Sequence, residues 1–139
     1  MNNREDELIE LARKYVAEAE ADSLKNPATD EIQIVVVEPN KKPYKKIMKN
    51  DLKAMNEIVG GYIEVINIGT TKSGGRVAIT LNEEGKLMGL PVNRAIVGFD
   101  ILVGTFFITA YNMEGDNISL TDQEANYYIK RFTPVEVYL

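Results

Sequence analysis

The sequence predicts an α+β fold: a mixed, largely antiparallel sheet of about five or six strands, two helices packed on it, and an N-terminal helix. Three observations lead to this prediction. A run at 32–37, in which five of six residues are β-branched, has the character of a central strand. Several other short apolar segments are separated by turn residues. Two stretches begin with residues that favour helix N-caps.

Residues 3–22 predict an amphipathic helix, because apolar side chains recur there at intervals of three and four. Pro27 and its polar neighbours end this pattern. We therefore divide the chain into a helical extension at 1–30 and a single α+β domain at 31–139. The apolar stripe of the helix either covers one side of the domain or docks on a partner, and in the second case it could hold an oligomer together.

The first half of the domain predicts a strand, an edge strand and a short helix. Ile32–Val37 does not alternate between apolar and polar residues, so we expect both of its faces to be covered. Residues 41–49 contain Pro43 and five lysines, which suit an edge strand because proline and charge discourage further pairing. Favourable N-cap residues at 50 and 51 and a terminating Gly60 predict a helix over 51–59.

Three further strands are expected in the middle of the chain. Tyr62–Ile68 and Arg76–Leu81 have strand patterns, and the residues at 69–75 join them as a hairpin loop. Residues 101–110 are apolar enough to form a second buried strand. Gly104 inside this run indicates a bulge or a close approach of the backbone.

The least generic stretch of the chain is 82–95. Residues 82–86 are expected to turn the chain, with Gly85 supplying a positive φ angle. Residues 87–90 are then expected to continue as a short strand or extended segment. Because no clean period follows, 91–96 is interpreted as a structured loop.

The C-terminal part predicts one helix and one strand. Thr121 and Glu124 have the spacing of a capping box, which predicts a helix over 122–132. Residues 134–139 alternate between apolar and polar character and predict an additional edge strand.

Composition limits the chemistry that this protein can perform. The chain has neither cysteine nor histidine, so it lacks thiolate nucleophiles, disulfides, the commonest general base and the commonest metal ligand. Catalysis would have to use carboxylates, lysine, tyrosine or bound Mg²⁺. The expectation therefore leans towards a protein that is not an enzyme and needs no cofactor or metal.

The distribution of charge bears on partners and location. The net charge of −5 lies entirely within residues 1–31, and the remainder is neutral. This balance argues mildly against a general nucleic-acid-binding domain, which is usually basic. We expect no membrane association and a cytoplasmic location, because the sequence has no apolar run long enough to span a bilayer and its N-terminus lacks a signal-peptide core.

The stretch 82–95 also contains the candidate ligand-binding residues. An arginine offers a bidentate fork and an asparagine offers both donor and acceptor, which suits a small anionic or nucleotide-like ligand. The candidate residues are Asn82, Glu83, Lys86, Asn93 and Arg94. The competing interpretation is structural. Arg94 would then pair with Glu83 or Glu84, and Asn93 would satisfy backbone groups of the loop.

Two other functions compete with ligand binding. A nucleic-acid-binding accessory protein would use the lysine-rich segment, with a tyrosine able to stack on a base. Its candidate residues are Lys41, Lys42, Tyr44, Lys45, Lys46 and Lys49. A carboxylate- or Mg²⁺-dependent hydrolase would use Glu83, Glu84 and Asp100.

Several runs of the sequence resemble one protein family. They are NEEGKLMGLPVNRA at 82–95, VEP at 37–39, IVGGYIEV at 58–65, DILVGTFFI at 100–108 and SLTD at 119–122. Together they resemble domain-of-unknown-function family three-eight-four-six over about residues 31–132. The resemblance implies a small cytoplasmic protein of phages, plasmids and other mobile elements of Gram-positive bacteria, and it carries over no catalytic residues. We therefore expect a binding protein that holds a host protein or a small nucleotide-like ligand.

Overall fold

The computed structural model describes residues 30–139. The predicted helix at 3–22, and with it the helical extension, lies outside the described residues. The described elements, in chain order, are β1 (Glu31–Val37), β2 (Tyr44–Lys49), α2 (Leu52–Val59), β3 (Ile63–Thr70), β4 (Arg76–Asn82), β5 (Val92–Ile96), β6 (Asp100–Val103), β7 (Phe106–Tyr111), β8 (Asn117–Ile118), α3 (Asp122–Arg131) and β9 (Glu136–Val137).

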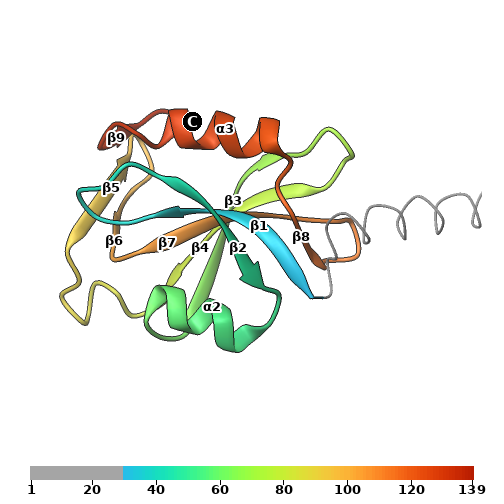
Figure 1. Cartoon of the computed structure of the whole chain (residues 1–139). Coiled ribbons are helices and arrows are strands. Elements are labelled where there is room, and N and C mark those ends of the chain that lie inside the picture. Colours follow the sequence, from blue (N-terminus) through green and yellow to red (C-terminus); the bar gives the residue numbers. More distant parts are fainter. Residues whose placement is uncertain (1–29) are drawn as a thin grey trace, which may run out of the picture.

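The strands form two sheets (Figure 1). The larger sheet has six antiparallel strands in the order β2-β1-β7-β4-β3, with β8 paired to β7. The smaller sheet has the order β6-β5-β9, in which β5 and β9 run parallel. The predicted α+β class and the mostly antiparallel sheet of five or six strands with two helices are confirmed. The second sheet was not predicted.

Strand β1 is central and buried on both faces, as its β-branched run predicts. Ile32, Ile34 and Val36 pack with α2 on one face of the large sheet, whereas Val35 and Val37 join the core on the other face. Figure 1 shows α2 and α3 on opposite sides of this sheet. The small sheet and α3 both contribute residues to the core that contains Val35 and Val37, so they cover the same face of the large sheet.

Both helices begin where their capping residues predict. The carboxylate of Asp51 accepts a hydrogen bond from the backbone N–H of Ala54 at 2.8 Å, and Gly60 ends α2 with a φ of 77°. Thr121 and Glu124 form the predicted capping box of α3. No helix within residues 30–139 is long and apolar enough to cross a membrane.

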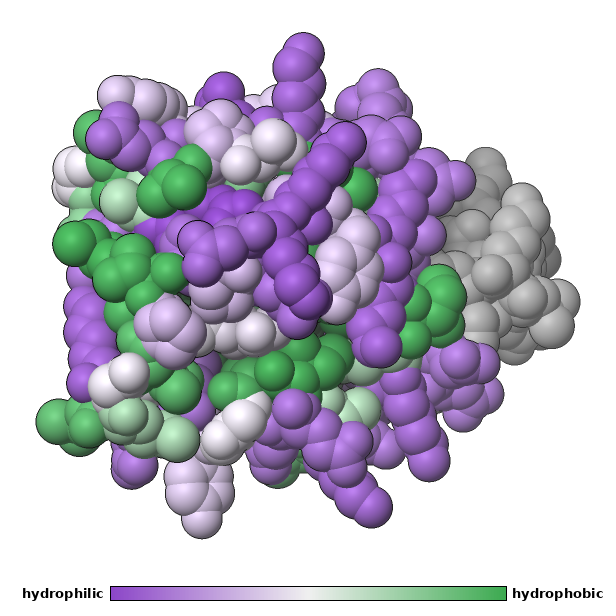
Figure 2. Space-filling model, turned by 60° about the vertical axis from the view of Figure 1, so that its left-hand side comes forward, coloured by the Kyte–Doolittle hydropathy of each residue, from purple (hydrophilic) through white to green (hydrophobic). Residues whose placement is uncertain are grey.

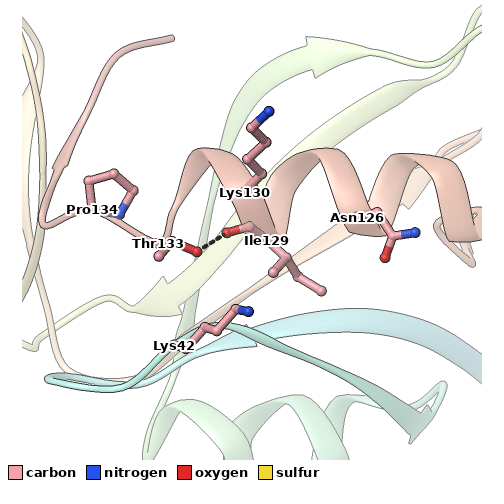
Figure 3. A pocket seen from close by; sticks show the side chains of 6 residues that line it. All are labelled: Lys42, Asn126, Ile129, Lys130, Thr133 and Pro134. Atoms are coloured by element: carbon pink, nitrogen blue, oxygen red, sulfur yellow. Dashed lines mark hydrogen bonds between the residues drawn. The ribbon is translucent and has the colours of Figure 1, made fainter.

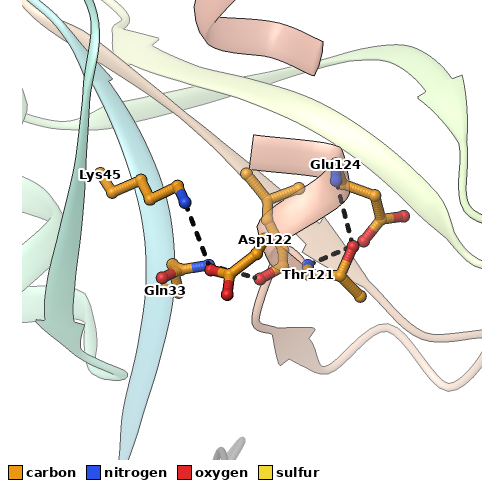
Figure 4. Close-up of polar contacts among 6 residues, drawn as sticks. Gln33, Lys45, Thr121, Asp122 and Glu124 are labelled. Carbon is orange, nitrogen blue, oxygen red and sulfur yellow. Dashed lines mark hydrogen bonds and ion pairs between the residues drawn. The ribbon is translucent and has the colours of Figure 1, made fainter. Parts of the chain in front are cut away.

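Polar contacts attach the start of α3 to the large sheet (Figure 4). Asp122 accepts hydrogen bonds from the side chains of Gln33 on β1, at 3.0 Å, and Lys45 on β2, at 3.4 Å. The bond from Gln33, followed by the contact with Lys45, lowers the pKa of the Asp122 carboxyl below its ordinary value. At the other end of α3, the rings of Phe132 and Phe106 meet edge to face at 5.8 Å.

The structure corrects the prediction for 82–96. Gly85 does not have a positive φ angle; a side chain there would contact Val103 at 3.0 Å, so close packing is the constraint. The chain turns at 83–86 as predicted, but the turns continue through 87–89, which were expected to be extended, and Gly89 supplies the positive φ. Val92–Ile96, interpreted as a loop, is strand β5.

The apolar run at 101–110 is two strands in different sheets. Asp100–Val103 pairs with β5, and Phe106–Tyr111 lies between β1 and β4. Gly104 separates them with a φ of 72°, and a Cβ at this position would lie 2.7 Å from Leu90 Cδ1. A side chain at 104 would therefore face both backbone strain and a collision.

A matched pair of glycine substitutions tests the role of Gly104, where the chain passes from the small sheet to the large one. Gly98 has a φ of 79° with no neighbour within 4 Å, so Gly98→Ala introduces backbone strain alone. We expect it to lower the free energy of unfolding by about 1 kcal/mol. Gly104→Ala adds overpacking and should cost roughly 1–3 kcal/mol more. Urea denaturation measures both, and equal losses would contradict the packing argument.

Candidate functional site

The structure divides the five candidate ligand-binding residues between two places. Asn82, Glu83 and Lys86 line a surface groove. Asn93 and Arg94 are buried in β5. The five residues therefore do not form a single constellation around one ligand.

Arg94 lies in the interior, where 2% of its surface is exposed. Its Nε donates to the carbonyl oxygen of Phe132 at 2.6 Å, and Nη2 donates to that of Lys41 at 2.7 Å. Nη1 donates to the backbone oxygen of Asn93 at 3.0 Å and to its Oδ1 at 2.8 Å. Burial lowers the pKa of the guanidinium from its ordinary value. The buried cation is thus stabilised by oxygen dipoles, including the carbonyl at the C-terminal end of α3.

Asn93 extends the same network towards the large sheet. Its Nδ2 donates to the carbonyl oxygens of Val37, at the end of β1, and Gly104, each at 2.8 Å. Asn93 does satisfy backbone groups, but those of Val37 and Gly104 rather than those of the loop that was expected at 91–96. The expected pairing of Arg94 with Glu83 or Glu84 is wrong, because carbonyl oxygens and the Asn93 amide occupy its donors. The geometry supports a structural role for both residues, while contact with a ligand stays a prediction.

The groove that contains the other three candidates lies between β3 and β6, and we call it the β3–β6 groove. Its volume is about 130 Å³. The lining residues are Glu64 and Ile66 on β3, Leu81 and Asn82 on β4, Glu83, Lys86 and Leu87 in the following turn, and Asp100, Ile101 and Val103 on β6. A space of this volume admits one side chain rather than a nucleotide-sized ligand.

Three hydrogen bonds fix the groove's rim. Lys86 Nζ lies 2.7 Å from Asp100 Oδ1, and this hydrogen bond lowers the pKa of the Asp100 carboxyl. The side chain of Asn82 accepts from the N–H of Glu84 at 2.8 Å and donates to the carbonyl of Val59 at 3.2 Å. Asn82 is buried, and its hydrogen bonds position the turn that carries Glu83 and Lys86.

A second hollow, of about 320 Å³, lies between the turn before β2 and the C-terminal half of α3. Its lining residues are Lys42, Asn126, Ile129, Lys130, Thr133 and Pro134. The Thr133 hydroxyl donates to the carbonyl of Ile129 at 2.6 Å. Lys130 extends away from Lys42, so the two ammonium groups do not converge on a common anion (Figure 3).

The lysine-rich segment is the predicted edge strand, but it does not present a single basic face. Three lysines are close to carboxylates: Lys41 to Glu38, Lys45 to Asp122 and Lys49 to Asp51. Adjacent side chains of a strand point to opposite faces, which separates Lys45 from Lys46. Tyr44 is exposed at the start of the strand. This dispersion gives the nucleic-acid alternative little geometric support.

The three acidic residues of the hydrolase alternative also lack a supporting arrangement. Asp100 is engaged by Lys86. Within residues 30–139, no group of three acidic residues is close enough to hold a metal ion. The geometry therefore does not favour a reaction that uses Glu83, Glu84 and Asp100.

A feature that sequence reasoning missed is a cluster of exposed apolar side chains around the small sheet, which we call the hydrophobic end. Leu87 is 90% exposed and Phe99 63%. The full set is Leu87, Met88, Val92, Val97, Phe99, Ile101, Tyr138 and Leu139. Figure 2, turned to bring this side forward, shows hydrophobic residues gathered on the face. In the sequence, the signal that could have revealed it is the pair Leu87 and Met88, two apolar residues in a turn-rich stretch.

Comparison with known proteins identifies one family. The family model described as "Domain of unknown function (DUF3846)" matches residues 32–133. No curated protein and no solved structure matches the chain. The match spans all described elements from β1 to α3, together with the β3–β6 groove.

Substitution of Arg94 tests its structural role. Arg94→Lys retains the charge but cannot reproduce a network in which three nitrogens reach separate oxygens. We expect it to lower the free energy of unfolding by roughly 2–5 kcal/mol, the cost of an incompletely paired buried charge. The exposed Arg76 provides the matched control, and Arg76→Lys should change stability by less than about 0.5 kcal/mol. Equal urea midpoints for the two variants would contradict the assignment.

Proposed function

The chain belongs to the family of domains of unknown function DUF3846, and we propose that it is a non-enzymatic binding protein of a phage or other mobile element that holds a host protein. The family match describes a domain without assigning it a function. The mobile-element setting comes from the sequence resemblance and is part of the proposal. The binding role is argued from the surface.

The observation that carries the proposal is the hydrophobic end. A large exposed apolar cluster on a small domain commonly marks a site of protein interaction. Here the cluster is built from adjoining segments. Leu87 and Ile101 line the same groove, and Ile96 is paired with Val137, which brings Val97 and Tyr138 side by side at the ends of their strands.

A protein partner fits this surface better than a small anionic or nucleotide-like ligand. Ligand pockets are usually enclosed and several times larger than the β3–β6 groove. The arginine that would have clamped an anion is buried and occupied by carbonyl oxygens. An extended apolar surface requires no deep pocket, because flat interfaces gain affinity from a few exposed apolar anchors.

Photo-crosslinking tests where the partner binds. A benzoylphenylalanine at position 99 lies in the hydrophobic end, whereas one at Leu52, 59% exposed on α2, is the matched control. In host extract we expect a discrete crosslinked polypeptide from position 99 and none from position 52. Val97→Asp in the same chain should remove the product, because a charge in an apolar interface is costly to desolvate. Equal labelling from both positions would contradict the proposal.

Thermal shift with a nucleotide panel separates the protein-binding role from the small-ligand role. A ligand present at 100 times its dissociation constant stabilises the folded state by about 2.7 kcal/mol. We expect no member of the panel to raise the melting temperature. A nucleotide that does so, and whose effect is lost in Lys86→Ala, would favour the small-ligand function.

A further inference from the structure

The β3–β6 groove is bounded by the open edges of both sheets. Strand β3 ends the order of the large sheet, and β6 ends that of the small sheet. Within residues 30–139, each pairs with one neighbour only, β3 with β4 and β6 with β5. Their outer backbone groups can therefore accept an additional extended segment.

The two edges of the large sheet differ in how they are protected. The β2 edge has three lysines and follows Pro43, features that discourage an incoming strand. The β3 edge, Ile63–Thr70, has neither lysine nor proline, and Val65 on it is half exposed. Its one irregularity lies between Asn67 and Gly69, beyond the groove residues Glu64 and Ile66. Within the described part of the chain, the edge beside the groove is thus the less protected of the two.

Charge around the groove selects the kind of segment that fits. Three carboxylates line it, those of Glu64, Glu83 and Asp100, against the single ammonium of Lys86. Lys86 is paired with Asp100, and neither Glu64 nor Glu83 forms an ion pair with any residue of 30–139. The groove therefore has two carboxylates that an incoming cation can neutralise.

The groove also has an apolar lining, which suits the aliphatic stem of a basic side chain. Ile66, Leu81 and Val103 line the groove together with the carboxylates. A lysine or arginine side chain has an aliphatic stem and a charged tip, so it can cover apolar surface while its cation reaches a carboxylate. The volume of about 130 Å³ suits one such side chain.

We propose that the β3–β6 groove binds an extended peptide segment of the partner protein, which pairs with the β3 edge and places one basic side chain between Glu64 and Glu83. Apolar residues two positions before or after the basic one lie on the same side of the segment and contact Leu87 and Ile101, where the groove joins the hydrophobic end. The inference rests on the proposed protein-binding function and names the chemistry of the segment that is recognised.

Fluorescence anisotropy with the full chain tests this inference. The probe is a labelled peptide as long as β3, in which valine alternates with threonine and one central valine is replaced by arginine, so that the arginine and the nearest valines lie on the same side. Matched peptides have glutamine or glutamate at that position, or N-methyl groups on alternate residues. We expect the arginine peptide to bind at least about tenfold more tightly than the glutamate peptide, and N-methylation to abolish binding.

Protein variants locate the binding site. The double variant Glu64→Gln/Glu83→Gln should raise the dissociation constant for the arginine peptide about tenfold and reduce its salt dependence. Glu57→Gln on α2, an exposed carboxylate outside the groove, is the matched control and should leave it unchanged. Equal affinity for the arginine and glutamate peptides, no binding of the arginine peptide, or no effect of the double variant would overturn the inference.

The outcomes separate this inference from the proposed function. If crosslinking at position 99 persists while no basic peptide binds, the partner uses the hydrophobic end without the groove, and only the inference fails. If crosslinking at 99 and at 52 is equal while the arginine peptide binds at the groove, the hydrophobic end fails as the docking surface and the groove stands. A self-associated protein that the peptide does not dissociate would identify a second copy as the occupant and overturn the inference.

Discussion

The buried guanidinium of Arg94 is the interaction on which the arrangement of the two sheets depends. It connects β5 to the C-terminal end of α3 and to the turn before β2, and the adjacent Asn93 connects β5 to β1 and to the glycine before β7. Three of the acceptors are carbonyl oxygens of buried residues, Val37, Gly104 and Phe132, and a buried oxygen without a donor is costly in a folded protein. The small sheet is therefore held to the large one by polar contacts as well as by apolar packing. Its outer strand β6 and the hydrophobic end are consequently held in place relative to β3.

The same arrangement explains why function is argued from an edge and a surface rather than from a cavity. The core residues of β1 and β7 fill the spaces between the large sheet and its covering elements. Among the openings that residues 30–139 leave are a narrow groove and a shallow hollow whose lysines diverge. Exposed apolar side chains gather where the groove meets the small sheet. An extended segment from a partner can use the groove and the exposed apolar side chains together, through backbone pairing, one charged contact and apolar contacts.

Elements with strong local signals could be predicted from the sequence. The β-branched run of β1, the lysines of β2 and the caps of α2 and α3 each act within a few residues, and each prediction is confirmed. The region from 82 to 104 could not be predicted, because its conformation is set by distant contacts. Asn93 and Arg94 resemble a polar ligand site in sequence, but their partners at Val37, Lys41 and Phe132 lie far away along the chain. Gly104 divides an apolar run that periodicity alone cannot assign to two sheets.

The central claim is that a protein segment pairs with the β3 edge in the β3–β6 groove. Hydrogen–deuterium exchange of the full chain, with and without the arginine peptide, measures this most directly, because an added strand slows exchange of the amides with which it pairs. The account predicts slower exchange in residues 63–70, and unchanged exchange in 44–49 on the lysine-rich edge. Protection confined to 44–49, or no protection at peptide saturation, would contradict it.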